Sequence, residues 1–107
     1  MKKIPVFIWQ DRVLKKINPD DIHCLVTVGN YTNIFVAPDK RVMVRCTLNN
    51  ALKKLPAGEF IKTNRSYAVS IYYIQEVARD HVKIEGIDIP LSKRYYKPLI
   101  AKLSVIA

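Results

Sequence analysis

FIKTNRSYAVS, at residues 60–70, places a polar, cationic segment between two apolar ones. Phe60 and Ile61 stand before the polar residues and Val69 stands after them, so both flanks are predicted to be extended strands. A loop that served packing alone would need no positive charge. The cations and hydrogen-bonding side chains of residues 62–67 therefore indicate a binding loop.

Two further loops have a related composition. GNYTN, at residues 29–33, lies between two β-branched runs, and SKRYY, at residues 92–96, repeats the cationic pattern. Three loops rich in amides, hydroxyls or cations on one small basic domain suggest a surface that contacts nucleic acid.

The overall composition favours a polyanionic partner. The 107 residues are enough for one domain with its own core, and we expect a single domain over residues 1–107. Lysine and arginine number 18 against 9 acidic residues, which gives a net charge of +9. This excess favours DNA, RNA or an anionic membrane surface as the partner. A solvated basic surface without any partner is the alternative.

The remaining bulk features indicate a cytoplasmic protein that does not span a membrane. No apolar run approaches the roughly 20 residues that cross a bilayer. The first nine residues begin like a signal peptide, but Gln10, Asp11 and Arg12 interrupt the apolar segment, which is better interpreted as a strand. Cys24 and Cys46 both have apolar neighbours, so buried reduced thiols are expected rather than a disulfide.

Strand signals dominate the chain. Apolar runs at residues 6–9 and 13–17 predict a hairpin, and a polar turn then leads into a strand at residues 22–28. Residues 41–46 alternate between polar and apolar side chains, as a half-buried strand does. Residues 82–89 alternate around a Glu-Gly pair, which predicts a second tight hairpin.

Two helices are expected among these strands. Thr47 is predicted to cap a short helix that ends at Pro56. Ser92 is a candidate cap for a C-terminal helix, in which Pro98 leaves two possibilities. Either proline interrupts one helix, or a short turn over residues 93–97 precedes a helix that begins at Pro98. The predicted fold class is mainly β, with one short helix mid-chain and one C-terminal helix.

The sequence carries no arrangement that is typical of an enzyme. The nine acidic residues are scattered, and Ser66 and Ser70 have no obvious histidine partner. His23 and His81 fall at no metal-ligand spacing with the two cysteines. The three glycines form no phosphate-binding loop. We therefore expect no enzymatic activity, no cofactor and no metal.

The three loops carry the side-chain types that bind DNA. Arginine, lysine, asparagine and glutamine can recognise bases in the major groove, and cations, hydroxyls and free backbone N–H groups bind phosphates. The candidate DNA-binding residues are Asn30, Tyr31, Thr32 and Asn33 in the first loop, Lys62, Asn64, Arg65 and Ser66 in the second, and Ser92, Lys93 and Arg94 in the third. Structural explanations also exist: Asn30 suits a left-handed turn, Ser66 could satisfy loop backbone, and Ser92 could cap a helix.

The order of these segments resembles the LytTR-type DNA-binding domain of bacterial transcription regulators. The similar segments extend over nearly the whole chain, at residues 20–22, 29–32, 47–56, 60–70 and 89–96. The resemblance implies about ten short strands with small helices. It also implies that loops, rather than a recognition helix, enter the DNA.

The resemblance suggests a role for each loop. The segment at residues 30–33 would enter one major groove and the segment at residues 92–94 the next, with Lys93 where the family commonly has a base-contacting arginine. Arg65, with Asn64, would lie over the intervening minor groove. Lys93 lacks the rigid arginine fork, and Thr32 stands where some members carry a larger polar side chain, so the base preference does not transfer.

Members of this family usually follow a phosphorylatable receiver domain and bind paired promoter repeats as dimers. The expected partners are therefore double-stranded promoter DNA and a second copy of the chain. A receiver domain does not fit within 107 residues. The chain is expected to be either an excised output domain or a stand-alone regulator.

Two other functions remain open. A protein-interaction or anti-regulator domain could keep this fold and lose DNA binding, although the cations Arg65, Lys93 and Arg94 argue against that loss. A β-rich RNA-binding module would need aromatic rings exposed on a sheet. The tyrosines of the chain could supply such rings, but tyrosines in strands and helices are more often half-buried.

Overall fold

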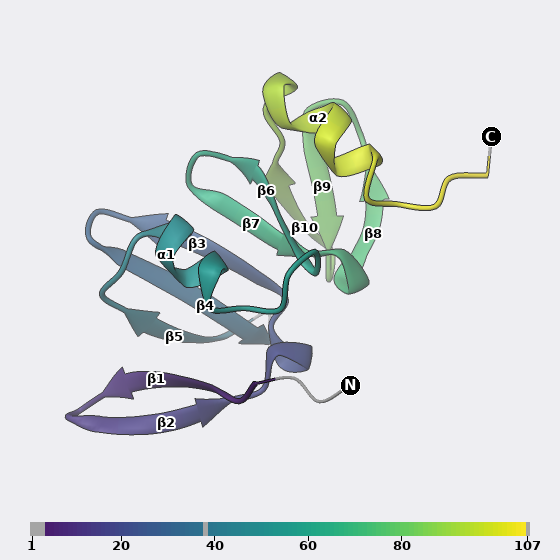
Figure 1. Cartoon of the computed structure of the whole chain (residues 1–107). Helices are drawn as coiled ribbons and strands as arrows, with labels where there is room; N and C mark the ends of the chain where they lie inside the picture. Colours follow the sequence, from purple (N-terminus) through teal and green to yellow (C-terminus); the bar gives the residue numbers. More distant parts are fainter. Residues whose placement is uncertain (1–3, 38, 107) are drawn as a thin grey trace.

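The structure is a computed structural model that describes residues 4–37 and 39–106, so the ends of the expected 1–107 domain lie outside the described residues. Strands dominate it (Figure 1). In chain order the elements are β1 (Val6–Gln10), β2 (Val13–Ile17), the 3-10 turn η1 (Pro19–Asp21), β3 (Cys24–Val28), β4 (Tyr31–Ala37), β5 (Lys40–Val44), α1 (Leu48–Lys53), β6 (Phe60–Asn64), β7 (Tyr67–Ser70), η2 (Ile71–Tyr73), β8 (Ile74–Val77), β9 (His81–Ile84), β10 (Ile87–Pro90) and α2 (Lys93–Ile100).

An antiparallel sheet of five strands forms the centre, in the order β5-β4-β3-β7-β6. In the middle strand β3, Leu25 lies opposite Ile34 and Ala68, and all three belong to one core cluster. Its neighbour Cys24 lies opposite Phe35 and Val69, in the other cluster. Because successive side chains point to opposite faces, the start of β3 is buried on both faces, and Cys24, Leu25 and Val26 follow one another without a polar alternation.

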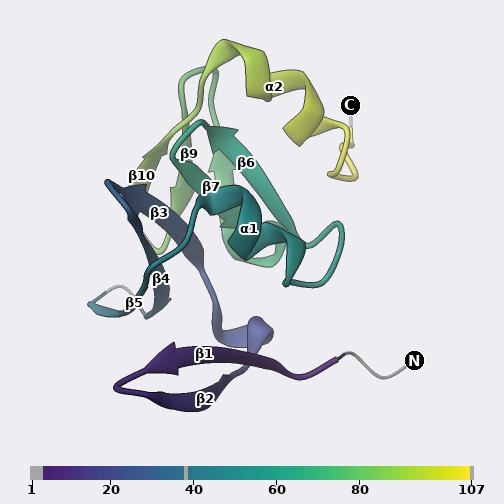
Figure 2. The same cartoon turned by 60° about the vertical axis from the view of Figure 1, so that its left-hand side comes forward.

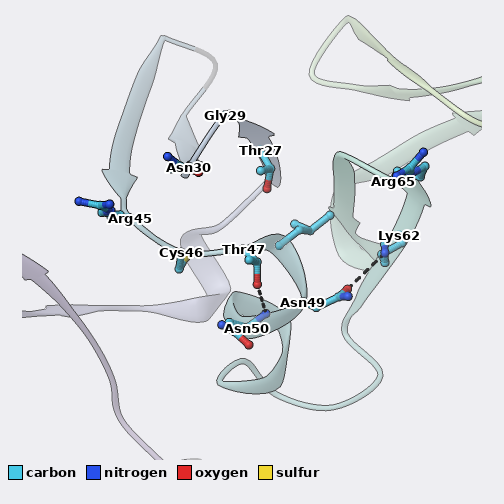
Figure 3. Close-up of a pocket in the computed structure, with 11 residues that line it drawn as sticks. Thr27, Gly29, Asn30, Arg45, Cys46, Thr47, Asn49, Asn50, Lys62 and Arg65 are labelled. Atoms are coloured by element: carbon cyan, nitrogen blue, oxygen red, sulfur yellow. Dashed lines mark hydrogen bonds between the residues drawn. The ribbon is translucent and has the colours of Figure 1, made fainter.

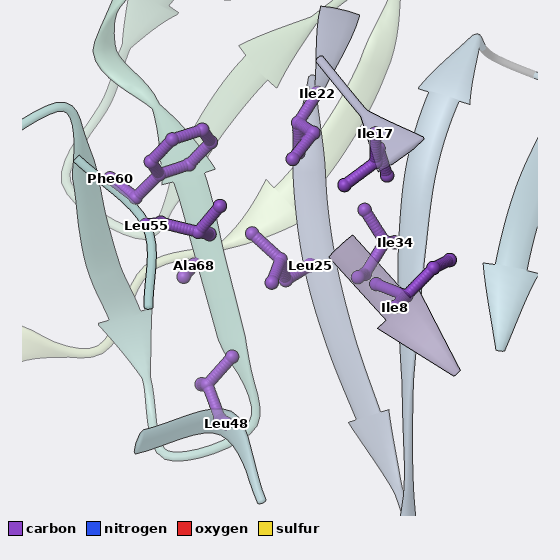
Figure 4. Packing of buried hydrophobic residues seen from close by; sticks show 9 residues of the cluster. All are labelled: Ile8, Ile17, Ile22, Leu25, Ile34, Leu48, Leu55, Phe60 and Ala68. Carbon is purple, nitrogen blue, oxygen red and sulfur yellow. The ribbon is translucent and has the colours of Figure 1, made fainter. Parts of the chain in front are cut away.

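The β1–β2 hairpin and α1 contribute to the first core cluster (Figure 4). Ile8 and Ile17 are buried with Leu25 and Ile34, while Leu48 and Leu55 enter from the helical segment. This hairpin confirms the sequence prediction. Its turn residues Asp11 and Arg12 have φ values of 51° and 65°, the left-handed conformation that two-residue hairpins require.

The three-stranded sheet β10-β9-β8 and helix α2 complete the second cluster. The predicted β9–β10 hairpin is confirmed, with Ile84 opposite Ile87 and with Glu85 and Gly86 at φ values of 50° and 75°. Leu99 of α2 has no exposed surface. The helices among the described residues are too short to cross a membrane.

Helix α2 runs without interruption over Lys93–Ile100, with Pro98 inside it. The expected alternative, a helix that begins at Pro98, is therefore wrong. Proline removes the N–H that would bond the carbonyl of Arg94. Both residues are exposed, so water can bond that carbonyl, while Leu99 stays anchored in the core.

The polar loop expected at residues 29–33 is shorter in the structure. Only Gly29 and Asn30 form a turn, because β4 begins at Tyr31 and pairs Tyr31–Asn33 with Val28–Val26 of β3. The left-handed residue of this turn is Gly29, at φ 60°, and not Asn30. The turn η2, which precedes β8, was not expected from the sequence either.

Candidate nucleic-acid interface

Three turns from distant parts of the sequence lie along one edge of the molecule (Figures 1 and 2). The N–H of Thr27, near the end of β3, donates to the carbonyl of Ser66 in the β6–β7 turn over 2.8 Å. The N–H of Ser92 donates to the carbonyl of Thr63 in β6, also over 2.8 Å. The Gly29–Asn30 turn, the β6–β7 turn and the start of α2 are therefore held beside one another by backbone hydrogen bonds.

A recess of about 460 Å³ opens between the first two turns and α1 (Figure 3). Its walls are polar and cationic, with Asn30, Arg45, Thr47, Asn49, Lys62 and Arg65 among the lining residues. Thr47 also caps α1 as predicted, because its Oγ1 accepts the N–H of Asn50 at 3.1 Å. The recess thus presents amide and cationic groups from three separate segments of the chain.

Lys62 connects α1 with α2. Its Nζ donates to Oδ1 of Asn49 at 3.2 Å and lies 5.7 Å from the centroid of the Tyr95 ring. The guanidinium of Arg94 lies 5.7 Å from the centroid of the same ring. Cations at this distance are attracted by the ring quadrupole. Two positive charges therefore lie beside the Tyr95 ring on this edge, where an anionic partner could contact them.

The structure places the candidate residues at different depths. Asn30, Tyr31, Arg65, Ser92, Lys93 and Arg94 are exposed, whereas Asn33, Lys62, Asn64 and Ser66 are half-buried. The first and third candidate segments thus each have at least two exposed side chains, whereas in the second segment only Arg65 is exposed.

Thr32 is the exception, since its relative exposure is 0%. Its hydroxyl donates to the carbonyl of Cys46 at 2.9 Å and lies 3.0 Å from Oγ1 of Thr27. The expectation that the Thr32 side chain contacts DNA is wrong for this structure, because β4 turns it inward. The next residue, Asn33, lies on the opposite face of the sheet, where its amide donates to the carbonyl of Val26 at 3.4 Å.

We expect Thr32→Val to lower the free energy of unfolding by about 1 kcal/mol, because it removes two hydrogen bonds of a buried hydroxyl. The Thr27 hydroxyl would lose its Thr32 partner, but Thr27 lines the open recess, so a water molecule can bond that hydroxyl instead. Urea unfolding measures this effect. The affinity of the folded variant for DNA should equal that of the parent, and a weaker affinity at unchanged stability would contradict the structural role.

Two backbone roles differ from the sequence expectation. The β6–β7 turn is fastened by Asn64, whose Oδ1 accepts the N–H of Ser66 at 2.8 Å, rather than by the Ser66 side chain. This turn leaves Arg65 exposed at its tip. Ser92 stands at the N-cap of α2, but its side chain makes no capping hydrogen bond. The exposed Ser92 hydroxyl thus remains available to a partner.

Sequence reasoning missed several residues of this edge. Arg45, Asn49 and Asn50 line the recess, and Arg79 lies 5.5 Å from the Tyr96 ring. Two consecutive asparagines are poor helix formers, so their place in the first turn of α1, after the cap Thr47 and Leu48, was the available signal. Arg79 gave no such signal. It joins the site only because α2 folds back beside it, forming a second cationic recess with Lys93, Arg94, Tyr96 and Lys97.

Comparisons with known proteins agree with this architecture. The LytTr DNA-binding domain family matches residues 12–104. Sensory transduction protein LytT of Enterococcus faecalis (strain ATCC 700802 / V583) is 32% identical over 103 residues, which cover 90% of this chain and 41% of that protein. The chain therefore spans less than half the length of this relative.

A solved structure shares the fold. It is a LytTr DNA-binding domain from Bacillus cereus, of a protein described as a methyl-accepting/DNA response regulator. The TM-score is 0.77 at 18% sequence identity, over 97% of this chain and 100% of that one. The predicted mainly β fold with two helices is thereby confirmed. Because the family match extends over most of the sequence, this chain belongs to the LytTr DNA-binding domain family.

Proposed function

We propose that this domain binds double-stranded promoter DNA at preferred sites, through turns that enter the grooves, and that it serves as the output domain of a transcription regulator. The observation that carries the proposal is the alignment of three polar segments along one cationic edge, fixed by the backbone hydrogen bonds of Thr27 and Ser92. A rigid scaffold with exposed cations at its tips suits both phosphate binding and base recognition.

Each segment has its own place in the proposed complex. The Gly29–Asn30 turn, with Asn30 exposed, enters one major groove. The start of α2, with Lys93 and Arg94, enters the next one. Arg65 lies between them, at the tip of the β6–β7 turn, where a narrow minor groove would attract its guanidinium. The missed residues Arg45 and Asn49 add contacts beside the first groove.

The side chains favour this function over the two alternatives. An RNA-binding sheet needs several exposed aromatic rings on one face. Among the described aromatics of the central sheet only Tyr31 is exposed, since Phe35 and Tyr67 are half-buried and Phe60 is buried. The exposed rings of Phe7 and Trp9 belong to the separate β1–β2 hairpin, and that of Tyr72 to the turn η2. A fold that had lost DNA binding would not need exposed cations at the tips of two of its three turns.

The length of the relative supports a role within a larger regulator, since this chain spans 41% of it. We propose that a receiver domain or another sensory part controls the domain in the full protein. We also propose that two copies bind together on paired repeats in a promoter.

We expect DNA affinity to fall steeply with salt. The five cations Arg45, Lys62, Arg65, Lys93 and Arg94 lie on the proposed surface, and each phosphate contact contributes about −0.9 to the slope of log affinity against log salt. If all five reach phosphate or lie beside it, the slope is about −4 to −5. Fluorescence anisotropy with a labelled duplex measures this slope.

A matched variant separates this edge from the general charge of the protein. Lys40 is exposed at the start of β5, at the end of the central sheet opposite to the Gly29–Asn30 turn. Lys40→Ala should leave the slope unchanged, whereas Arg65→Ala should make it shallower by about one. Equal effects of the two variants would refute the assigned surface. Selection from random duplexes then tests for a preferred site.

A further inference from the structure

The outer face of the β1–β2 hairpin is apolar and uncovered in the monomer. Ile8 and Ile17 point into the core, so the alternate residues point outward. Phe7 is 50% exposed and Trp9 65% exposed, and Leu14, opposite Trp9, is 48% exposed. Several large apolar side chains on one short hairpin mark a surface that binds another protein surface.

Cations surround this apolar face. Lys16 lies opposite Phe7 on this face, and Arg12 stands in the turn; both are exposed. A symmetric contact between two such hairpins would bring these charges against one another. The hairpin instead suits an apolar groove with negative charge at its rim.

Such a groove exists on the opposite face of the central sheet. It has a volume of about 400 Å³, with Phe35, Tyr67, Ile87 and Ile89 among its walls and the carboxylates of Glu85 and Asp88 beside them. Both acidic residues are exposed. Asp88 lies opposite Lys83 in β9, and its Oδ1 is 4.0 Å from Nε2 of His81, yet its side chain remains 60% exposed.

The hairpin and the groove lie on different faces of the five-stranded sheet. The hairpin packs with Leu25 and Ile34, whereas Cys24, Val26 and Phe35 line the groove. Since Leu25 alternates with Cys24 and Val26 along β3, the two surfaces belong to opposite sides. One copy can therefore offer its hairpin while its own groove remains open to a third copy.

We propose that the partner of the hairpin is a second copy of this chain, whose β9–β10 groove receives Trp9 and Leu14 while Glu85 and Asp88 face Arg12 and Lys16. The contact is head-to-tail, because different patches meet. The role of this contact rests on the proposed function: it would hold two copies on consecutive DNA repeats that have the same orientation. The Gly29–Asn30 turn and the start of α2 contribute no residue to it.

Trp9 provides a direct readout, because it is the only tryptophan of the chain. Its emission should shift to shorter wavelength as protein concentration rises, in parallel with self-association to dimers and longer chains, measured by sedimentation equilibrium without DNA. Both changes should weaken at high salt, which screens the charges at the rim. A protein that stays monomeric up to about 1 mM at low salt would overturn the proposal, since it would bind itself with less than about 4 kcal/mol.

Two variants then test which surfaces meet. Leu14→Ser removes an exposed apolar side chain of the hairpin, and Glu85→Lys with Asp88→Lys reverses the charge of the groove. For each variant alone, the association constant for self-association should fall at least about tenfold. Mixed in equal amounts, the two should form a dimer as tight as that of the parent, because one copy keeps an intact groove and the other an intact hairpin.

Other outcomes identify what is wrong. If Leu14→Ser abolishes the dimer and the groove variant does not, two hairpins meet and the proposal fails. If the mixture does not recover the dimer, the head-to-tail contact is wrong; Ile87→Ser, which leaves the charges intact, checks that conclusion by an apolar change in the same groove. Loss of DNA binding by the unmodified chain would refute the proposed function alone, since the sedimentation measurement contains no DNA.

Discussion

Leu99→Ala should lower the free energy of unfolding by about 2–5 kcal/mol, the range observed for leucine truncation in a packed core. Leu99 has no exposed surface and packs in the second core cluster with Val69 and Val82. Its removal leaves a cavity between α2 and the sheets, and α2 cannot close that cavity easily, because Ser92 at its start is bonded to Thr63. Urea unfolding followed by circular dichroism measures the loss.

Leu14→Ala is the matched control for this prediction, because the same side chain is truncated at a position that is 48% exposed. We expect a change within about 0.5 kcal/mol in dilute solution, where the chain is monomeric. Similar losses for Leu99→Ala and Leu14→Ala would show that α2 does not contribute to the core as the structure has it. The start of α2 would then be a poor platform for base recognition.

The features that the sequence predicted correctly depend on neighbouring residues. The turn between residues 10 and 13 and the Glu85-Gly86 turn are set by short-range conformational preferences. Thr47 caps the helix that begins at the next residue, through the N–H of Asn50 three positions along. The burial of the Cys24 thiol was likewise predicted from its neighbours in the sequence. Cys24 lies in an apolar strand, and burial raises its pKa to about 11, so the thiol is protonated at neutral pH.

The errors arise where distant residues decide the outcome. Thr32 is polar and stands beside a turn, which suggested exposure, but its hydroxyl bonds a carbonyl 14 residues away. Pro98 suggested a break, but the packing of Leu99 and the solvent exposure of the proline preserve α2. Arg45 and Asn49 reach the recess only because β5 and α1 fold beside the β3–β4 turn. Local patterns do not contain such long-range contacts.

Lys93→Ala should weaken binding to the preferred DNA site by about 1–3 kcal/mol, or roughly 5- to 150-fold, and should relax base preference at one position of that site. Lys93 is exposed at the first position of α2, on the edge that carries Arg94 and Arg65. Its ammonium can donate to guanine without the two-pronged geometry of arginine. Competition between the preferred site and each single-base variant measures the loss of selectivity.

Three comparisons separate base recognition from simple attraction. Lys62→Ala removes a cation that is already bonded to Asn49 and placed over Tyr95, so it should weaken binding to all sequences about equally. Lys40→Ala, at the opposite end of the central sheet, should change neither affinity nor selectivity. Lys93→Arg should keep or sharpen the preference, because the guanidinium can bond guanine through two donors. If Lys93→Ala instead resembled Lys62→Ala, with uniform weakening and intact preference, Lys93 would contact phosphate, and the base-reading role would pass to another exposed group on this edge.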